Sequence, residues 1–91
     1  MLRCLELVNC ELTEKDVTAV LLYLQRLRSL ALVNCRDVFM SGTFLSNPAE
    51  REEIGQNLAG LRVLKLDDNK YLSDILLIRI TEATPNIKEL R

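Results

Sequence analysis

The residues best suited to chemistry in this chain are its three cysteines, Cys4, Cys10 and Cys35. A catalytic thiol needs a general base, and the usual one is histidine. The sequence contains no histidine, and nothing beside Cys4 in the sequence would activate it as a nucleophile. We therefore expect no enzymatic activity, and no catalytic residue is predicted.

The segment 67–71 (DDNKY) is the part of the chain that most invites a metal-binding interpretation. A calcium loop of the EF-hand type requires Asp or Asn at its fifth position, glycine at its sixth and glutamate at its twelfth. Counted from residue 67, these positions hold Tyr71, Leu72 and Ile78, so the match fails. We expect Asn69 instead to bond the loop backbone at the end of a strand. Zinc-type Cys/His spacing and a glycine-rich phosphate loop are also missing from the sequence, so no metal and no cofactor is predicted.

A leucine repeat indicates the elements that would hold these side chains. The pattern L-x-x-L-x-L-x-x-(C/N) occurs three times and begins a fourth time near the end of the chain. The copies are Leu2-Leu5-Leu7-Cys10, Leu27-Leu30-Leu32-Cys35 and Leu61-Leu64-Leu66-Asn69, followed by Ile87 and Leu90. The pattern is typical of leucine-rich repeats, in which each unit gives one short strand and one helix to a curved stack. It predicts an α/β fold, a right-handed leucine-rich-repeat solenoid of about three and a half repeats, with short parallel strands on the concave face and helices on the convex face.

A chain of 91 residues is expected to form at most one small domain, and the repeats are the units of that domain. The first positions of the units lie 25, 34 and 26 residues apart (2 to 27, 27 to 61, 61 to 87). This spacing gives repeats at about 2–26, 27–60 and 61–86, a partial repeat at 87–91, and an insertion at about 39–47. Terminal repeats of a solenoid need polar caps. The sequence begins and ends inside repeats, so we expect a piece of a longer protein whose uncapped ends permit self-association.

Strands and helices can be placed inside each unit. Alternation of apolar and polar residues predicts three strands whose repeat leucines face inward. They lie near Cys4–Val8, Ser29–Val33 and Val63–Asp67. Helices should begin at the capping box that opens at Thr13, around 46–48, and at 73–74. Pro85 prevents the last helix from continuing past about residue 84.

Composition narrows the class of partner and the cellular setting. Hydrophobic residues make up 48% of the chain and aromatic residues only 4%, which fits an aliphatic solenoid core. The net charge of −1 gives no basic field for nucleic acid, and no apolar run approaches the roughly 20 residues of a membrane-spanning helix. We expect a protein partner rather than nucleic acid or a membrane. The lack of a signal-peptide core and of an Asn-x-Ser/Thr sequon favours an intracellular location, cytoplasmic or nuclear.

Cys10 and Cys35 occupy the same position in successive units, so they should be near neighbours in space. A disulfide between them is geometrically conceivable. The interpretation we favour is a small, reduced, half-buried side chain at the turn after each strand.

The side chains between the repeat leucines should form the concave surface. Strands about 4.8 Å apart would align them in rows, and repeat scaffolds bind partners through this inner curve. The predicted partner-binding residues are Glu6, Val8, Ala31, Val33, Lys65 and Asp67. The alternative is that the small residues among them merely permit tight curvature.

A second set of candidates is the basic column, the four basic residues that follow the first apolar residue of each unit. They are Arg3, Arg28, Arg62 and Lys88. Stacked at strand spacing, these cations would repel one another mildly, and an acidic partner or a phosphate would compensate them. The alternative is a row of solvated charges whose aliphatic stems cover the strand entrance.

The insertion is a third candidate because it holds the two phenylalanines of the chain, Phe39 and Phe44, beside Met40. Exposed aromatic residues on a long loop make strong anchors for a partner. The alternative is that the phenylalanines cap the core where the helix register shifts.

Two further features are shared with one family of repeats. A leucine–Thr/Ser–acid step follows the turn in two units, and a Pro-Asn pair precedes the last strand. The segments are Leu12-Thr13-Glu14, Leu72-Ser73-Asp74 and Thr84-Pro85-Asn86-Ile87-Lys88-Glu89-Leu90. With the turn cysteines, they resemble the cysteine-containing leucine-rich repeats of F-box proteins, whose units look like L-x-x-L-x-L-x-x-C-x-x-L-T/S-D, a helix, then C-P-N-L. The resemblance covers nearly the whole chain except the insertion, but Asn69 and Thr84 stand where the family has cysteine, and no F-box sequence precedes the repeats here.

The resemblance implies a function in protein recognition. In F-box proteins a separate portion docks to the adaptor of a cullin–RING ubiquitin ligase, and the repeats hold the substrate. This chain would then supply substrate recognition alone. The alternative is a leucine-rich-repeat adaptor or scaffold of another intracellular system, whether cytoskeletal, ciliary or innate-immune.

Overall fold

The computed structural model describes residues 3–91, and within this range the chain forms a small α/β fold of four strands and four helices. In chain order they are β1 (Cys4–Val8), α1 (Glu14–Tyr23), β2 (Ser29–Val33), α2 (Arg36–Phe39), α3 (Pro48–Asn57), β3 (Val63–Lys65), α4 (Asp74–Ala83) and β4 (Glu89–Leu90). Leu2, which opens the first repeat of the sequence, lies outside the described residues. The longest of these helices has 10 residues, so no described helix has the length and apolar character to cross a membrane.

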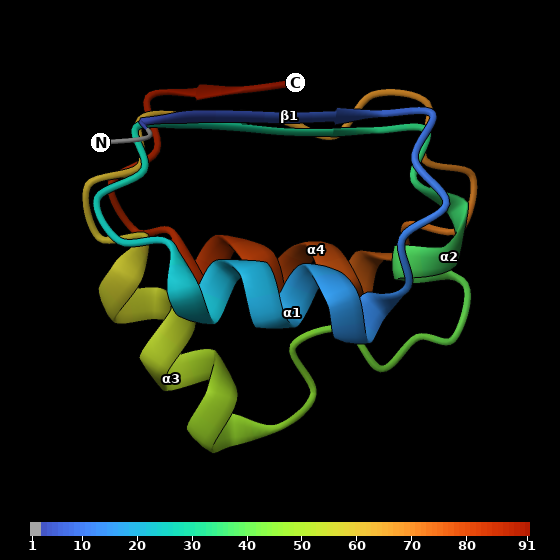
Figure 1. Ribbon diagram of the computed structural model, residues 1–91, viewed down its shortest axis with the longest axis horizontal. Helices are drawn as coiled ribbons and strands as arrows, with labels where there is room; N and C mark the ends of the chain where they lie inside the picture. The colour runs from blue at the N-terminus through green and yellow to red at the C-terminus, as the bar shows by residue number, and fades with distance from the viewer. Residues whose placement is uncertain (1–2) are drawn as a thin grey trace.

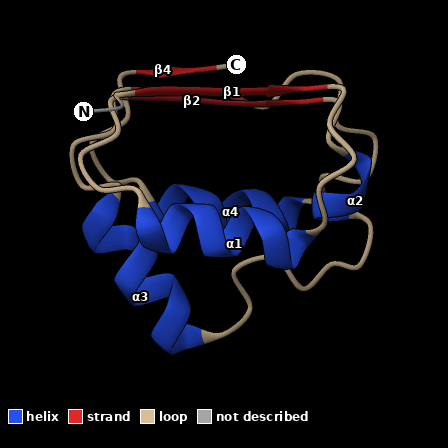
Figure 2. Ribbon diagram, in the orientation of Figure 1, coloured by secondary structure: helices blue, strands red, loops and turns tan. Residues whose placement is uncertain are grey.

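The strands form one parallel sheet whose order follows the sequence, β1-β2-β3-β4. The register places Leu5, Leu30, Leu64 and Leu90 side by side. All described helices lie on one side of this sheet, and no part of the described chain forms a layer over the other side (Figure 1, Figure 2). Parallel neighbours need a crossover connection, and each crossover here carries its helix to the same face.

The predicted bounds of the first two strands are confirmed, whereas the third strand is shorter than predicted. β1 and β2 cover Cys4–Val8 and Ser29–Val33, but β3 ends at Lys65 instead of Asp67. The backbone nevertheless continues beside β2, because the amide of Asn34 donates to the carbonyl of Asp67 over 3.1 Å. The row of outward side chains therefore extends through residue 67.

The three longer helices begin where the sequence predicts, each after a side-chain cap. In α1 the Oγ1 of Thr13 accepts from the amide of Asp16 (3.3 Å), and the amide of Thr13 donates to Oδ2 of Asp16 (3.1 Å), which completes the capping box. Asn47 caps α3 and Ser73 caps α4. These caps satisfy N–H groups that have no partner inside a helix. α4 ends at Ala83, within one residue of the predicted end.

The core lies between the sheet and the helices. Its buried aliphatic members include Val17, Leu21, Leu27, Leu30, Leu32, Val38, Ile54, Leu58, Leu61, Leu64, Leu66, Leu76 and Ile80. The repeat leucines of β2 and of the β3 segment face this core as predicted. Leu5 and Leu7 of β1 are only half-buried, because β1 lies at the edge of the sheet. Burial of each such side chain contributes roughly 1.5–3 kcal/mol, so this shared interior holds the sheet and its uncovered face in place.

The middle unit departs from the other two because its helix lies elsewhere. α3 tilts away from the sheet, below the level of α1 and α4 in Figure 1. Phe39 and Phe44 are 1% and 2% exposed, and their rings meet edge to face with centroids 5.7 Å apart. Phe44 and the buried Leu45 line the same interior space as the leucines of β2. The insertion thus completes the core of the middle unit.

Candidate interaction surface

The uncovered side of the sheet, which we call the open face, carries the first group of predicted partner-binding residues. The register aligns them in two rows. One row is Glu6, Ala31 and Lys65, and the other is Val8, Val33 and Asp67. Five of these six residues are exposed or half-buried, and Val8 is 54% exposed. The structure therefore gathers the predicted residues on one surface opposite the helices.

Ala31 is the exception, and its prediction as a contact residue is wrong. Its side chain is 3% exposed, although the register places it on the open face. β2 is an interior strand, so the longer side chains of Glu6 and Lys65 stand on either side of the alanine methyl group. Ala31 forms the base of the surface and leaves the contact to its neighbours.

The open face carries charges of both signs. Arg91, which continues the backbone ladder beside Lys65, places its Nε 3.5 Å from Oε2 of Glu89. This is the one ion pair found within residues 3–91. Glu6, Lys65 and Asp67 therefore have no ionic partner in the described chain, and their charges are open to groups from outside it.

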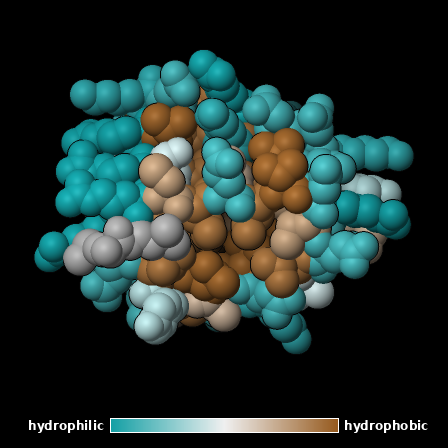
Figure 3. All heavy atoms as spheres, turned by 45° about the horizontal axis from the view of Figure 1, so that its top comes forward, coloured by the Kyte–Doolittle hydropathy of each residue, from teal (hydrophilic) through white to brown (hydrophobic). Residues whose placement is uncertain are grey.

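Apolar side chains interrupt the hydrophilic surface next to the open face. Figure 3, in which the sheet side is turned toward the viewer, shows hydrophobic residues gathered in the middle of the view and hydrophilic residues around them. Apolar area within a polar surround is typical of surfaces that contact another macromolecule. The exposed Val8 and the half-buried Val33 add β-branched area to the open face itself.

The basic column is brought together as predicted, at the edge where the strands begin. The amide of Arg28 donates to the carbonyl of Arg3 (2.7 Å), that of Arg62 to Arg28 (2.8 Å), and that of Lys88 to Arg62 (2.8 Å). Arg62 is half-buried, and its Nη1 donates to the carbonyl of Asn86 over 3.4 Å. The other three residues are exposed. Arg62 thus fits the alternative interpretation, a cover for the strand entrance, while the other three keep their charges in solvent.

The recognition function predicted for Phe39 and Phe44 is wrong, because both rings lie inside the core. Met40 alone of the three predicted loop residues is exposed, at 50%. The loop is also held by a hydrogen bond from α4, since Nη1 of Arg79 donates to the carbonyl of Gly42 over 3.0 Å. The phenylalanines are members of the buried core.

The turns at the ends of the strands place cysteine and asparagine in equivalent positions. Sγ of Cys35 donates to the carbonyl of Leu7 over 3.2 Å, and Nδ2 of Asn69 donates to the carbonyl of Leu32. Leu7 and Leu32 hold the same position in successive repeats. The side-chain amide of Asn69 therefore makes the hydrogen bond that the thiol of Cys35 makes one repeat earlier. Oδ1 of Asn69 also accepts from the amide of Cys35 over 2.8 Å, which confirms the predicted bond to the loop backbone.

Cys10 and Cys35 are placed for structure, since the sulfur of Cys10 accepts from the amide of Leu12 and that of Cys35 donates to the carbonyl of Leu7. Cys35 is buried and Cys10 half-buried, and both are free thiols, as is the exposed Cys4. Burial raises the pKa of the Cys35 thiol, which favours the neutral form that donates to Leu7. An activated nucleophile needs the opposite, a thiol whose charged form is stabilised.

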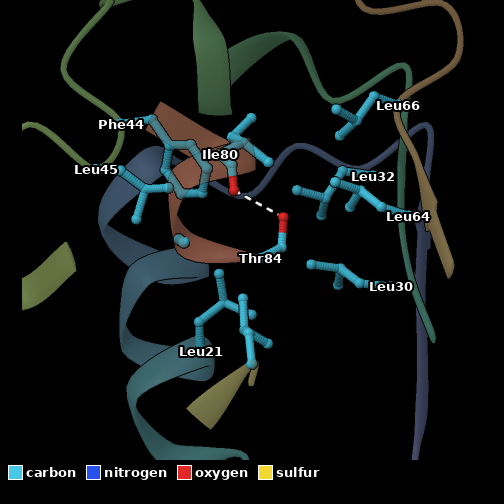
Figure 4. A pocket seen from close by; sticks show the side chains of 11 residues that line it. Leu21, Leu30, Leu32, Phe44, Leu45, Leu64, Leu66, Ile80 and Thr84 are labelled. Carbon is cyan, nitrogen blue, oxygen red and sulfur yellow. Dashed lines mark hydrogen bonds between the residues drawn. The ribbon is translucent and has the colours of Figure 1, made fainter. Parts of the chain in front are cut away.

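A small space lies between the sheet and the helices, and Figure 4 shows leucines of the sheet facing Phe44 and Ile80 across it. Its volume is about 10 Å³, which is at the lower limit for a single water molecule. Thr84 brings a hydroxyl group to it, but this Oγ1 already donates to the carbonyl of Ile80 over 2.9 Å. The cavity is a gap in the packing and has no group left to bind a ligand.

Arg26 and Asn57 have a placement that the sequence interpretation did not anticipate. The amide of Arg26 donates to the carbonyl of Asn57 over 3.3 Å, which fixes Arg26 beside the basic column. The side chain of Asn57 in turn donates to two carbonyls at the end of α1 (3.0 and 3.1 Å). A signal was present in the sequence, since Arg26 and Arg28 flank the buried Leu27 and both must therefore point away from the core.

No protein-family model, curated protein or solved structure matches the chain. The function is accordingly inferred from the repeat pattern and from the surfaces. Two of these carry charged groups without partners inside the described chain: the open face and the edge where the strands begin.

Proposed function

We propose that this chain is part of a leucine-rich-repeat solenoid and that it binds a protein partner through the open face of its sheet. One observation carries the proposal, namely a parallel sheet with all described helices on one side. Parallel sheets in compact proteins are usually covered on both faces. A solenoid is the architecture that leaves its inner strands free for a partner.

The equivalence of the turns supports the solenoid. Asn9, Asn34 and Asp68 follow successive strands at the same repeat position, and their φ angles are 53°, 51° and 60°. Non-glycine residues rarely adopt this left-handed conformation, and Asn and Asp are the types that do so most readily. In addition, Nδ2 of Asn34 donates to Oδ1 of Asn9 over 2.7 Å. Like turns bonded to one another support a stack of like units.

The chemistry of the open face favours a polypeptide of mixed charge. Lys65 shares a row with Glu6, and Asp67 shares a row with two valines. A protein partner can pair charges of both signs and also cover the valines, whereas a uniform polyanion would be repelled by Glu6 and Asp67. The expected partner is therefore a protein segment with both charged and aliphatic side chains.

The more specific proposal is the substrate-recognition domain of an F-box-type ubiquitin ligase subunit. It rests on the resemblance of the cysteine-containing repeats, and the equivalent bonds of Cys35 and Asn69 explain how asparagine can replace one of the cysteines. In this function the chain supplies binding energy without chemistry of its own, in an intracellular setting. The alternative is an adaptor or scaffold of another intracellular system. A full-length protein whose upstream sequence lacks an F-box would favour this alternative.

Affinity capture with the full-length protein tests the proposal, using two matched variants. Lys65→Glu reverses a charge on the open face, and Lys15→Glu makes the same change at an exposed position of α1. We expect Lys65→Glu to reduce the amount of captured partner protein at least about 10-fold, which corresponds to about 1.4 kcal/mol. Lys15→Glu should retain the partner, and both variants should retain the circular dichroism of the wild type.

Two results would contradict the open face as the contact surface. One is equal capture by Lys65→Glu and the wild type. The other is loss of helical signal in Lys65→Glu, which would assign the residue to the fold. Co-purification of ligase adaptor components would support the F-box assignment, and capture of other partners without them would favour the alternative.

A further inference from the structure

A hollow lies at the edge of the sheet where the strands begin, beside the ends of α1 and α3. Its volume is about 440 Å³, within the roughly 300–1,000 Å³ of small-ligand sites. It is lined by three arginines, Arg3, Arg26 and Arg28, and by the amide side chains of Gln25 and Gln56, among other residues. No carboxylate of residues 3–91 lines it. The charged side chains that line the hollow are therefore all cationic, and two of the carbonyl groups at the C-terminal end of α1 already accept from the side chain of Asn57.

The three guanidinium groups are not neutralised elsewhere in the fold. None of them forms an ion pair with a residue of the described chain, and Arg3, Arg26 and Arg28 are all exposed. Like charges gathered at one hollow repel one another, and a bound anion would remove this repulsion. The arrangement is thus suited to an anionic ligand.

The backbone that carries the arginines is held in place. The amide of Arg28 donates to the carbonyl of Arg3 (2.7 Å), which joins β1 to β2. Arg26 has a φ of 65° and donates from its amide to the carbonyl of Asn57 (3.3 Å), which joins it to the end of α3. Because these anchors come from three different elements, the backbone that carries the arginines needs little reorganisation when a ligand binds.

We propose that this hollow binds a phosphate monoester carried by a segment of a protein partner. Such a group has a charge of about −1.5 to −2 at pH 7 and three acceptor oxygens. Guanidinium groups bind phosphate oxygens in a bidentate manner, and the amides of Gln25 and Gln56 can donate to the oxygens that remain. A single carboxylate, with one charge and two oxygens, would leave most of the three cations unmatched.

The site is separate from the open face and does not depend on the function proposed for that face. Exposed Lys88 and half-buried Arg62 continue the positive charge along the same edge, so a phosphorylated segment can lie along the strand entrance. Nucleic acid is a weaker fit, because no aromatic side chain of the described chain lines the hollow for stacking against bases.

Fluorescence anisotropy with the full-length protein tests the proposal. The probe is a labelled peptide of uncharged residues with one phosphoserine, compared with the same peptide carrying serine or glutamate in its place. Inorganic phosphate and a single-stranded oligonucleotide serve as competitors. We expect the phosphoserine peptide to bind at least about 10-fold more tightly than the serine peptide, with the glutamate peptide between them.

Matched variants locate the site. Arg26→Ala combined with Arg28→Ala should weaken binding of the phosphoserine peptide at least about 10-fold, and Arg28→Lys should lose part of the affinity because it keeps the charge without the fork. Arg36→Ala removes a cation beyond the end of β2, at the opposite edge of the sheet, and should bind within about twofold of the wild type. Lys65→Glu should also retain binding, which separates this site from the open face.

Several outcomes would overturn the proposal. They are equal binding of the phosphoserine and serine peptides, equal losses in the Arg36→Ala and double variants, and tighter competition by the oligonucleotide than by unlabelled phosphopeptide. If inorganic phosphate competes as well as the unlabelled phosphopeptide, the site binds free phosphate, and the proposal that a protein segment carries the phosphate is wrong. If the double variant does not fold, Arg26→Gln and Arg28→Lys are judged singly by the same criteria.

Discussion

At the edge where the strands end, polar side chains bond to the backbone of a neighbouring unit, whereas at the edge where the strands begin, cationic side chains extend into solvent. Asn69 makes three hydrogen bonds to backbone groups at the first edge, and Cys35 donates there to the carbonyl of Leu7. At the second edge, Arg3, Arg26 and Arg28 form no ion pair within residues 3–91. The same repeat thus produces one edge whose polar side chains have partners within the chain and one edge whose cationic side chains have no ionic partner within residues 3–91.

The difference separates residues that hold the fold from residues available to a ligand. A buried polar group that loses its partner must bear its desolvation penalty, so Asn69 is tied to stability. An exposed guanidinium group is solvated in both the folded and the unfolded state, so its removal changes the free energy of unfolding little. Arg62 marks the boundary between the two kinds of residue, because it lies in the basic column and yet donates to the carbonyl of Asn86.

The largest expected loss of stability comes from a substitution in the core, which lies between the two edges. Leu64 is fully buried and Leu90, its neighbour in the register, is 47% exposed. Leu64→Ala should lower the free energy of unfolding by about 2–5 kcal/mol, because it leaves a cavity in the shared core. Leu90→Ala removes the same atoms from a site open to solvent and should lose much less. Urea unfolding followed by circular dichroism measures both, and equal losses would contradict a shared core centred on Leu64.

The next largest effect tests the comparison of the edges directly. Asn69→Ala removes three hydrogen bonds at the end of β3, and we expect the free energy of unfolding to fall by about 1–3 kcal/mol. Asn69→Cys should recover part of this loss, because Cys35 shows that a thiol can donate to the equivalent carbonyl. Arg28→Ala at the other edge should change stability by less than about 0.5 kcal/mol. A loss in Arg28→Ala as large as that in Asn69→Ala would erase the distinction.

Local pattern was enough to predict the bounds of β1 and β2 and the starts of α1, α3 and α4, whereas the short helix α2 was not predicted. The period-two alternation gives the bounds of β1 and β2, because each repeat leucine must face the helices. The caps at Thr13, Asn47 and Ser73 sit at the predicted helix starts, since capping depends on residues only two or three positions apart. The placement of the basic column follows from the same spacing, because residues at one repeat position meet in a parallel register.

Burial could not be predicted where it depends on neighbours in space. Ala31 has the alternation of an outward residue, but the side chains that flank it come from two other strands. Phe39 ends the short helix α2 and Phe44 lies in the loop that follows, and each ring is buried against the other and against the core. Arg26 joins the hollow because its amide bonds to Asn57, a residue far along the chain. Each of these outcomes is set by tertiary contacts that the sequence pattern does not contain.

The smallest predicted effect is a pH dependence that belongs to the edge where the strands end. Burial raises the pKa of the Cys35 thiol above its ordinary value, so the folded state holds the proton more tightly than the unfolded state does. This contribution to stability is fully present below the ordinary thiol pKa and is lost as pH rises from there through the raised value. We expect the free energy of unfolding to fall across that alkaline range in the wild type. The control variant Cys4→Ala, which removes an exposed thiol, should show the same fall. Cys35→Ala should lack this part of the slope, and a slope equal to that of the wild type would mean that Cys35 is not the group that loses its proton on unfolding.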